Sequence, residues 1–559
     1  MLGTFSSDRL AHRAPWLLML LALVLLAPGT GTLPLLDRDE PRFAGATVEM
    51  MQRHEWVVPY FNGEYRFDKP VLTYWLMRGG YALFGVGELG ARAHSVLAAM
   101  LLALVVFHIG RRWFSARVGG LAAGMLLFSL QMLIHGRSAV ADMPMVLFVA
   151  LSQWALWELL QKFSWRWFWV FHLSLGAGFL AKGPIAWAVP LLSALLFRFV
   201  FARAPQPWRN LKLLRGLPVV LLVVGAWGIP ALLATHGDFW RVGMGEHVMK
   251  RGFAAFDGRR FVPFYYLPSA LFSLFPWIAC VGFGWAELRR SWDAKQAFLV
   301  SWLLAPYLIF TLYSTQLPHY VLPAIPAFFL ILAHAAGHPG LHAPRWAIPF
   351  RAFVFGLMGT AVVALAAAGC WARPGTEFAP LRGVLWGAAA LGTGLLIAGG
   401  QFRHPRGRWL TVAALTVAAG LGTLGFGLRQ VLPAVKLQGV FARMPAGTEF
   451  LCYRFREPTL VFYSGRRWAL PDTREELAAA LARPGPRLAV VIETQVDAGR
   501  LLKAKLAEWM GRGSPMEQED FSAENTGLVL PGYRAEFVEG LNVAKGQWVR
   551  LKVIYRAGL

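Results

Sequence analysis

Long apolar runs recur along the chain from Trp16 to Leu428, and short polar connections separate them. Many of these runs approach the roughly 20 residues that an α-helix needs to cross a bilayer. The expected spans are Trp16–Leu36, Ser95–Ile109, Val118–Ile134, Met143–Leu160, Trp167–Leu180, Pro184–Phe197, Leu217–Leu233, Tyr265–Phe283, Phe298–Tyr313, Val321–Leu332, Phe353–Cys370, Leu385–Gly399 and Trp409–Leu428. The pattern predicts an α-helical polytopic membrane protein with about thirteen spans.

The apolar pattern divides the chain into a membrane domain, 1–430, and a hydrophilic tail, 431–559. Within the first loop, 37–92, the apolar stretch Val71–Val86 is broken by Arg78 and two glycines, which indicates an interfacial helix rather than a span. The run Trp16–Leu36 lacks a small-residue cleavage site, so we interpret it as a retained anchor rather than a signal peptide.

The tail has the alternating pattern of a small α/β domain. Thr473 and Glu476 form a capping box that opens a helix, and this helix is expected to stop before Pro484. Further expected elements are a strand at Leu488–Ile492, a second helix at Val496–Met510 and a strand at Trp548–Tyr555. The tail contains no catalytic constellation, so we expect a cap or an acceptor-docking module.

Charge fixes the expected orientation. The 559 residues carry a formal net charge of +24 although only 15% are charged, and the basic residues cluster in alternate connections. By the positive-inside rule those connections are cytoplasmic, as is the N-terminus, whereas the first loop and the tail face the other side. The basic residues therefore orient the chain and meet anionic lipid, and no nucleic-acid partner is expected. Three cysteines are too few for a disulfide framework.

With this topology, unusual polar residues gather at one membrane face. They are Asp39 and Glu40 after the first span, Asp68 and Lys69 later in that loop, Asp142 and Lys182 at helix ends, Glu246, His247 and Arg251 before the eighth span, and His319 and Tyr320 before the tenth. Charges near hydrocarbon are costly, so they pair, line a wet cavity or carry out chemistry. Their one-sided clustering indicates a shared cavity.

Each of these residues also has a structural interpretation that stays open. Asp142 could balance Arg137, Asp68 and Lys69 could form a local ion pair, and Lys182 could be a lysine that extends to the interface. His319 could serve packing alone. An acidic and histidine-containing cluster permits a divalent cation at Asp39, Asp142 or His319 without requiring one, and no obligatory cofactor is expected.

The motifs of the first loop resemble a known family. They are Asp39-Glu40, Arg42-Phe43-Ala44, Glu49-Met50, Trp56-Val57-Val58-Pro59, Phe67-Asp68-Lys69-Pro70 and Tyr74-Trp75, with Ala181-Lys182-Gly183-Pro184, Glu246-His247, Arg251 and Leu317-Pro318-His319-Tyr320 further on. This pattern is similar to that of class C (GT-C) glycosyltransferases, in particular the lipid A aminoarabinose transferase and protein O-mannosyltransferase-like family. The likeness covers essentially the whole membrane domain.

The resemblance implies a GT-C fold with interfacial helices in the first periplasmic loop and a periplasmic tail domain, in the bacterial inner membrane. It also implies an inverting transfer of a sugar, 4-amino-4-deoxy-L-arabinose, from undecaprenyl phosphate to lipid A. By the motif match, Asp39 and Asp142 are catalytic, and Lys69, Asp68, Arg251, His319 and Tyr320 bind the donor phosphate. Glu40, Arg42, Lys182, Glu246 and His247 support them.

Three positions depart from the aminoarabinose transferase pattern: Asp68 stands where Glu is expected, Gln316 where Lys is usual, and His319 where a small polar residue is usual. These departures leave the sugar and the acceptor open, so transfer to a protein or another glycan is an alternative. Asp39 is a general base for a hydroxyl acceptor, or an orienting group for a phosphate acceptor. A transporter would instead place charges at mid-membrane on broken helices, and a scaffold would not need Asp39 or Lys69.

Overall fold

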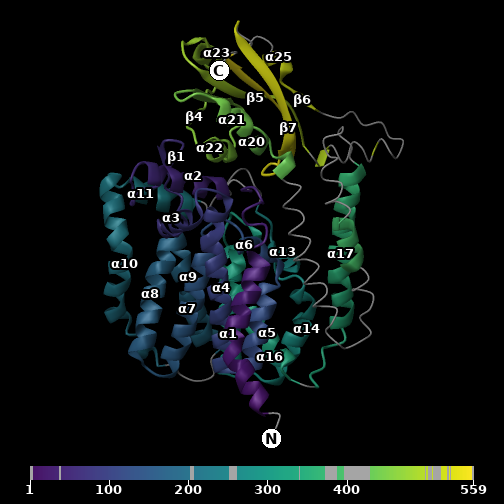
Figure 1. Cartoon of the computed structure of the whole chain (residues 1–559). Coiled ribbons are helices and arrows are strands. Elements are labelled where there is room, and N and C mark those ends of the chain that lie inside the picture. The colour runs from purple at the N-terminus through teal and green to yellow at the C-terminus, as the bar shows by residue number, and fades with distance from the viewer. Residues whose placement is uncertain are drawn as a thin grey trace.

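The protein is a bundle of long helices with a sheet domain at one end (Figure 1). A computed structural model of the chain describes residues 4–36, 39–201, 207–250, 261–338, 340–371, 387–395, 429–497, 499–500, 507, 518–525, 528 and 531–556. The N-terminus lies at the end of the bundle opposite the sheet domain, and the C-terminus lies in that domain (Figure 1). Two chemically different parts are therefore stacked along one axis.

The helical part contains α-helices together with short 3-10 and π segments. These are α1 (Thr4–Leu26), α4 (Glu88–Trp113), α5 (Ala116–Leu127), α6 (Leu130–His135), α7 (Asp142–Gln161), α8 (Trp165–Lys182), α9 (Ile185–Leu196), η1 (Phe197–Phe201), η2 (Trp208–Leu211), α10 (Leu213–Ala234), α11 (Asp238–Trp240), η3 (Arg241–Lys250), α13 (Tyr266–Ser273), η5 (Trp277–Cys280), α14 (Val281–Arg290), α15 (Ala294–Thr311), η6 (Pro318–Ala324), α16 (Ile325–Ala336) and α17 (Ala347–Trp371). Each expected span up to Cys370 falls largely on one or more of these helices.

Within the described residues, six helical segments are long and apolar enough to cross a bilayer, and a bent pair makes a seventh. The six are Glu88–Trp113, Asp142–Gln161, Trp208–Ala234, Ala294–Thr311, Pro318–Ala336 and Ala347–Ala364. A multi-pass helical membrane protein is thereby confirmed, whereas the number thirteen stays a prediction. Of the last two expected spans, residues 387–395 are helical and Trp409–Leu428 lies outside the described residues.

Three expected spans are interrupted. The first helix ends at Leu26, because Pro28 and Pro34 follow and residues 27–36 form turns. The third expected span is divided between α5 and α6, where the Ser129 side chain caps α6 by accepting a hydrogen bond from the Met132 amide at 3.4 Å. The span Tyr265–Phe283 is wrong as one straight helix, since α13 and the segment Trp277–Arg290 meet at 104° around Pro276.

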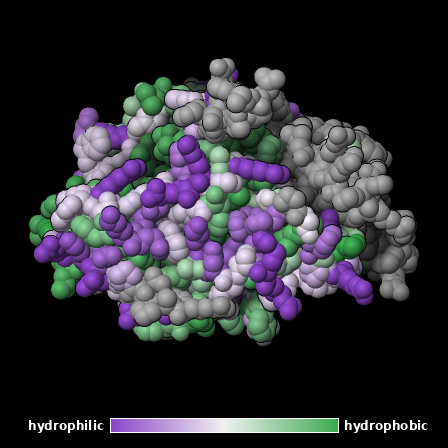
Figure 2. Space-filling view, turned by 90° about the horizontal axis from the view of Figure 1, so that it is seen from below, coloured by the Kyte–Doolittle hydropathy of each residue, from purple (hydrophilic) through white to green (hydrophobic). Residues whose placement is uncertain are grey.

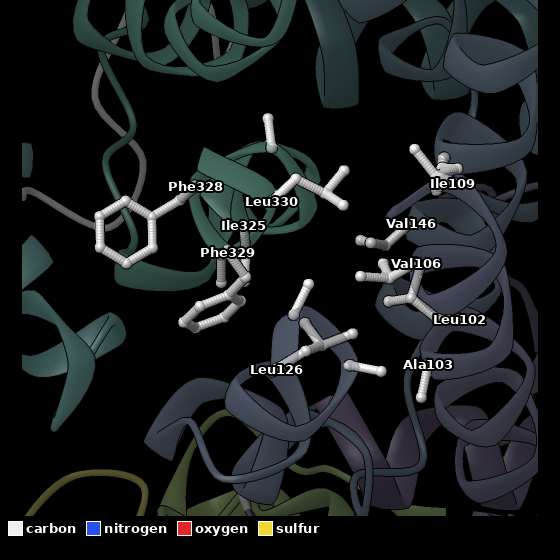
Figure 3. Close-up of a cluster of buried hydrophobic side chains, with 14 of the residues drawn as sticks. Leu102, Ala103, Val106, Ile109, Leu126, Val146, Ile325, Phe328, Phe329 and Leu330 are labelled. Carbon is white, nitrogen blue, oxygen red and sulfur yellow. The ribbon is translucent and has the colours of Figure 1, made fainter. Parts of the chain in front are cut away.

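Aliphatic and aromatic side chains of α4, α5, α7 and α16 fill the centre of the bundle. Figure 3 shows Leu102 and Val106 facing Leu126, with Val146, Ile325 and Leu330 closing the cluster. A glycine pair brings α4 and α5 close together, because a Cβ on Gly119 would lie 2.3 Å from the Phe107 carbonyl oxygen. This packing holds the helices whose ends carry the polar cluster.

The first loop folds into a compact layer between the bundle and the sheet domain (Figure 1). It contains α2 (Asp39–Gln52), the hairpin strands β1 (Tyr60–Phe61) and β2 (Glu64–Tyr65), and α3 (Leu72–Phe84). Asn62 and Gly63 both have positive φ, 56° and 88°, which a two-residue hairpin turn requires. The helix α3 confirms the helix expected at Val71–Val86, and α2 adds a second helix to the loop.

The tail forms an α/β domain, as expected. Its elements are α20 (Pro433–Lys436), α21 (Gln438–Arg443), β3 (Glu449–Tyr453), α22 (Pro458–Ser464), β4 (Trp468–Ala469), α23 (Arg474–Ala482), β5 (Arg487–Asp497), β6 (Glu519–Asp520), α25 (Ser522–Asn525), β7 (Tyr533–Asn542) and β8 (Gln547–Arg556). The sheet has the order β4-β3-β5-β8-β7, with β6 beside β5. Strands β3, β4 and β5 are parallel, whereas β8 is antiparallel to both β5 and β7.

Most local signals in the tail are confirmed. Thr473 accepts a hydrogen bond from the Glu476 amide at 3.2 Å, and α23 ends before Pro484. The strands at Leu488–Ile492 and Trp548–Tyr555 lie within β5 and β8. The helix expected at Val496–Met510 is wrong at its start, because Val496 continues β5 in register with Trp548. Residues 498, 501–506 and 508–510 of that prediction lie outside the described residues.

Candidate functional site

A buried ion pair lies at the end of the bundle next to the first loop. Lys182, the last residue of α8, donates to the carboxylate of Asp142, the first residue of α7, at 2.5 Å. The Asp142 side chain is buried, with 6% exposed, and the Lys182 side chain is mostly buried, with 12% exposed. Asp142 therefore does not balance Arg137, whose guanidinium donates to the Leu25 carbonyl instead. The side chain of Lys182 is fixed by its partner rather than extended toward lipid.

Aromatic and imidazole rings surround this pair. The Lys182 ammonium lies 5.5 Å from the centre of the Tyr320 ring, and the rings of His319 and His135 are 4.9 Å apart. Asp142, Lys182 and Lys69 are all close enough to His319 for their charges to act on it. Asp142, Lys69, Lys182, His319 and Tyr320, far apart in the sequence, thus meet in one place, and His135 is an addition that the sequence reasoning missed.

An apolar groove opens from the two lysines. It encloses about 150 Å³ and is lined by Lys69, Asp68 and Pro70 of the first loop, by Lys182 and Pro184, and by an apolar wall. That wall comprises Phe67, Phe179, Val224, Trp227, Ala231, Leu232, Phe239, Trp240 and Met244. The groove therefore combines two cationic side chains with a long hydrophobic surface on α10, α11 and η3.

A second group of charges lies on the loop side of the groove. Arg66 is buried, its Nε donates to the Tyr74 hydroxyl at 3.0 Å, and it pairs with Asp68 at 3.1 Å. Burial disfavours the Arg66 cation, but Tyr74, Asp68 and Asp39 outweigh it and raise its pKa. Asp68 is thus an ion-pair partner of Arg66, a residue that the sequence reasoning did not single out. Asp39, the first residue of α2, is exposed and acts on the same Arg66 charge.

Glu40 has a different set of partners from Asp39, and its hydrogen bonds fix the backbone of neighbouring segments. Its carboxylate accepts two hydrogen bonds from the buried Arg92 at 2.9 Å and one each from the Leu36 and Ala139 amides. Arg92 also donates to the carbonyls of Thr30, Leu33 and Pro34. One pair therefore joins α2, α4, the turns after α1 and the turn before α7. Arg92 was missed, although an arginine at the start of an apolar run is the signal that could have indicated it.

A larger cavity of about 520 Å³ lies between the first loop and the tail domain. Arg42, Arg66 and Asp68 line it from the loop, and Arg456 and Glu457 line it from the tail. Because Asp68 and Phe67 border both hollows, the apolar groove and this polar cavity meet at the first loop. The tail domain is thus part of the wall of the site.

The remaining predicted residues are on or beyond η3. Glu246 is exposed there, at a position that follows the groove residues Gly243 and Met244. The side chain of His247 and the whole of Arg251 lie outside the described residues. A cation at Asp39, Asp142 or His319 stays a prediction, and the Lys182 ammonium already occupies one oxygen of Asp142.

Comparisons with known proteins agree with this architecture. The family described as dolichyl-phosphate-mannose-protein mannosyltransferase matches residues 68–229. The crystal structure of ArnT from Cupriavidus metallidurans bound to undecaprenyl phosphate superposes with a TM-score of 0.74, at 18% identity over 97% of this chain and 98% of that one. The fold is therefore that of the class C membrane glycosyltransferases.

Sequence relatives identify the family. The undecaprenyl phosphate-alpha-4-amino-4-deoxy-L-arabinose arabinosyl transferase of Edwardsiella ictaluri is 30% identical over 428 residues, 73% of this chain and 75% of that protein. The enzyme of that name from Pseudomonas aeruginosa (strain UCBPP-PA14) is 34% identical over 343 residues, 58% of this chain, and the match spans 60% of the relative. The chain belongs to the family of these arabinosyl transferases.

Proposed function

We propose that the protein is an inverting glycosyltransferase that moves 4-amino-4-deoxy-L-arabinose from undecaprenyl phosphate to a phosphate of lipid A. The observation that carries this proposal is the groove in which Lys69 and Lys182 stand at the end of a wall of apolar side chains. A polyprenyl phosphate is complementary to this groove, because its head is anionic and its long tail is a hydrocarbon. The names of the sequence relatives supply the sugar and the carrier.

The two lysines suit the leaving group. Cleavage of the glycosidic bond turns a phosphodiester into a phosphate dianion, so cations placed where this charge develops stabilise the transition state. Asp142 holds the Lys182 ammonium at 2.5 Å and thereby acts as a positioning residue. The Tyr320 ring lies beside that ammonium, and the His319 ring lies 5.1 Å from the Tyr320 ring.

Asp39 is the candidate residue on the acceptor side of the anomeric carbon, opposite the leaving phosphate. A single displacement inverts the anomeric carbon, and the acceptor attacks from the face opposite the leaving phosphate. A phosphate acceptor is already anionic near neutral pH, so Asp39 acts by orienting it or by stabilising positive charge on the sugar ring, rather than as an obligatory base. The Arg66 cation lies close enough to Asp39 for the two charges to interact.

The polar cavity suits an anionic acceptor. Arg42 and Arg456 line it from opposite domains, and arginine binds phosphate through two parallel hydrogen bonds. Its volume of about 520 Å³ leaves room for a sugar headgroup. The acceptor thus enters above the membrane, and the donor enters from the lipid through the apolar groove.

The proposal includes the orientation and the location. The site and the tail domain are periplasmic, and the N-terminus is cytoplasmic, in the inner membrane of a bacterium. The bundle face remote from the tail is rich in hydrophilic side chains (Figure 2), in keeping with the basic connections that the positive-inside rule assigns to the cytoplasm. Thirteen spans, an odd number, are consistent with termini on opposite sides.

A second candidate is transfer of a lipid-linked sugar to a protein or another glycan. One observation favours it: the family that matches residues 68–229 is described as a protein mannosyltransferase. Donor binding would be the same in both cases, because those residues include Lys69 and Lys182. Only the acceptor cavity would serve a different partner.

Complementation tests the proposal. The chain is expressed in a strain that lacks its own aminoarabinose transferase, and lipid A mass and polymyxin resistance are measured. We expect the wild type to restore the added sugar and Lys69→Ala or Asp39→Ala to fail at equal expression. Lys162→Ala, an exposed lysine at the far end of α7, is the matched control and should behave as wild type. Unchanged lipid A with well-expressed wild type would eliminate this acceptor and favour the second candidate.

A further inference from the structure

A cluster of three side chains with metal-binding atoms lies at the opposite end of the bundle from the groove. Glu287 is on the last turns of α14, His334 is on the last turn of α16, and His338 follows one turn later. Their ligand atoms all lie within 4.8 Å of one another. His338 lies just beyond the C-cap of α16, Gly337, and its Nδ1 and that of His334 both lie within 3.4 Å of Glu287.

The geometry within the cluster is tight. His334 Nδ1 lies 3.4 Å from one oxygen of Glu287, and His338 Nδ1 lies 3.2 Å from the other. Two ligands of a tetrahedral zinc ion, each about 2.0–2.1 Å from the metal, are about 3.3 Å apart. The carboxylate and the two imidazoles are thus already separated as neighbouring ligands are.

Among the described residues, two buried polar atoms at the cluster have no hydrogen-bond partner. They are His338 Nδ1 and Gln296 Oε1. Gln296 Nε2 lies 2.8 Å from His334 Nδ1, so with the amide NH₂ as donor this nitrogen is unprotonated, and a metal ion would replace Gln296 as the partner of its lone pair. Glu287 is fully buried, and His334 is only 18% exposed. The buried Glu287 carboxylate therefore faces one nitrogen of each imidazole, in addition to its contacts with polar neighbours on α14.

We propose that Glu287, His334 and His338 bind a divalent transition-metal ion of the zinc class. Imidazole nitrogen and carboxylate oxygen are ligands that zinc accepts, and three protein ligands leave one position for water. The metal joins the end of α14 to the end of α16, and the Phe114 ring, 4.1 Å from the His334 ring, brings the end of α4 against it. The site is therefore a structural clamp on the end of the bundle remote from the groove.

Two neighbours, Arg290 and Ser291, compete with the metal for the Glu287 carboxylate. Arg290 donates to both oxygens of Glu287, at 3.2 and 3.1 Å, and Ser291 donates to one of them at 2.5 Å. The Arg290 side chain is 48% exposed, so it can turn into solvent when a metal arrives. Removal of the Arg290 charge is consequently expected to strengthen metal binding. If the cluster only served the Arg290–Glu287 ion pair, the same change would remove that pair without any gain in metal affinity.

Zinc binding to the full-length protein in detergent tests this inference. The protein is treated with a chelator, titrated with Zn²⁺ against a chromogenic competitor, and its metal content is measured after gel filtration. We expect the wild type to hold one more zinc per chain than His338→Ala, with affinity at this site lowered about 100-fold or more in the variant. Arg290→Gln should bind several-fold more tightly. The difference in zinc content between the wild type and His338→Ala distinguishes this site from any other metal site on the chain.

His342→Ala is the matched control, since His342 is an exposed histidine on the same connection. It should hold as much zinc as the wild type. Equal zinc in the wild type and in His338→Ala, no zinc in the wild type, or an equal loss in His342→Ala would overturn the proposal. If alanine at 338 prevents a monodisperse preparation, Glu287→Gln replaces it, with the loss of the cobalt-substituted absorption spectrum as the readout.

Discussion

Asn62 and Trp468 exchange two hydrogen bonds across 406 positions of sequence: Asn62 Nδ2 donates to the Trp468 carbonyl at 2.8 Å, and the Trp468 amide donates to Asn62 Oδ1 at 2.7 Å. The side-chain amide thus pairs with the edge strand β4 as another strand would. Because Asn62 is in the turn of the first-loop hairpin, this contact joins the loop that carries Lys69 to the tail domain. The polar cavity between them depends on that junction.

Replacing Asn62 by glycine should loosen this junction without disturbing the turn. Glycine tolerates the φ of 56° at this position, so only the two side-chain hydrogen bonds are lost, each contributing about 1 kcal/mol. Amide exchange at Trp468 and Ala469 should become faster, while exchange in the middle of β5 stays slow. Exchange at β4 equal to that of the wild type would show that other contacts hold the domain.

Breaking the Lys182–Asp142 pair should destabilise the bundle as well as abolish transfer. Lys182→Met leaves a buried carboxylate without its partner, which costs about 3–5 kcal/mol. The double variant Asp142→Asn with Lys182→Met should recover much of the thermal stability but none of the activity, because the cation is still missing. Thermal unfolding and lipid A mass spectrometry measure the two effects separately. Recovered activity in the double variant would contradict the role of Lys182.

Filling the apolar groove should weaken donor binding without harming the fold. A side chain at Gly228 has no atom within 4 Å of its Cβ, and this residue lines the groove. Gly228→Leu should therefore raise KM for the polyprenyl donor several-fold with kcat less affected. Gly225→Leu, one turn earlier on α10 and not among the groove residues, should leave KM unchanged. Equal effects of both variants would mean that the donor does not use this groove.

Glu40→Gln should be strongly destabilising. Arg92 would keep its carbonyl acceptors but lose the carboxylate charge of Glu40, and breaking a buried ion pair costs about 3–5 kcal/mol. Glu64→Gln, an exposed acid of the same loop, should change the unfolding temperature little. Similar unfolding temperatures for Glu40→Gln and the wild type would show that the pair does not hold the loop.

Tyr74 should give the protein a distinct alkaline limit. Burial raises the pKa of Tyr74 to about 12, above the ordinary value of 10.0. The unfolded chain releases this proton first, so the contribution of Tyr74 to stability is complete below pH about 10 and is lost as the pH rises toward 12. Tyr74→Phe should lower stability at pH 8 by about 1–3 kcal/mol, because the Nε of the buried Arg66 loses its acceptor. The variant should also show a shallower decline above pH 10 in thermal unfolding.

Much of the site was predictable because the hydropathy pattern indicates how far each residue lies from the centre of the membrane. The apolar runs place Asp39, Lys69, Lys182 and His319 at one level relative to the membrane, and residues at one level with opposite charge are candidates for a shared cavity. Local signals were equally informative where the interaction is short in sequence, as with Thr473 and Glu476. The class of protein and the face that carries the site therefore follow from the sequence by itself.

Only the tertiary structure decided which of these residues meet. Hydropathy gives the level of a side chain but not its direction around the helix axis, so it could not choose between Arg137 and Lys182 as the partner of Asp142. It also could not foresee the 104° bend at Pro276, because a bent pair of helices has the same apolar composition as one straight span. The buried pairs of Arg66 with Asp68 and of Arg92 with Glu40 depend on neighbours from other elements, and packing of the whole bundle selects those neighbours.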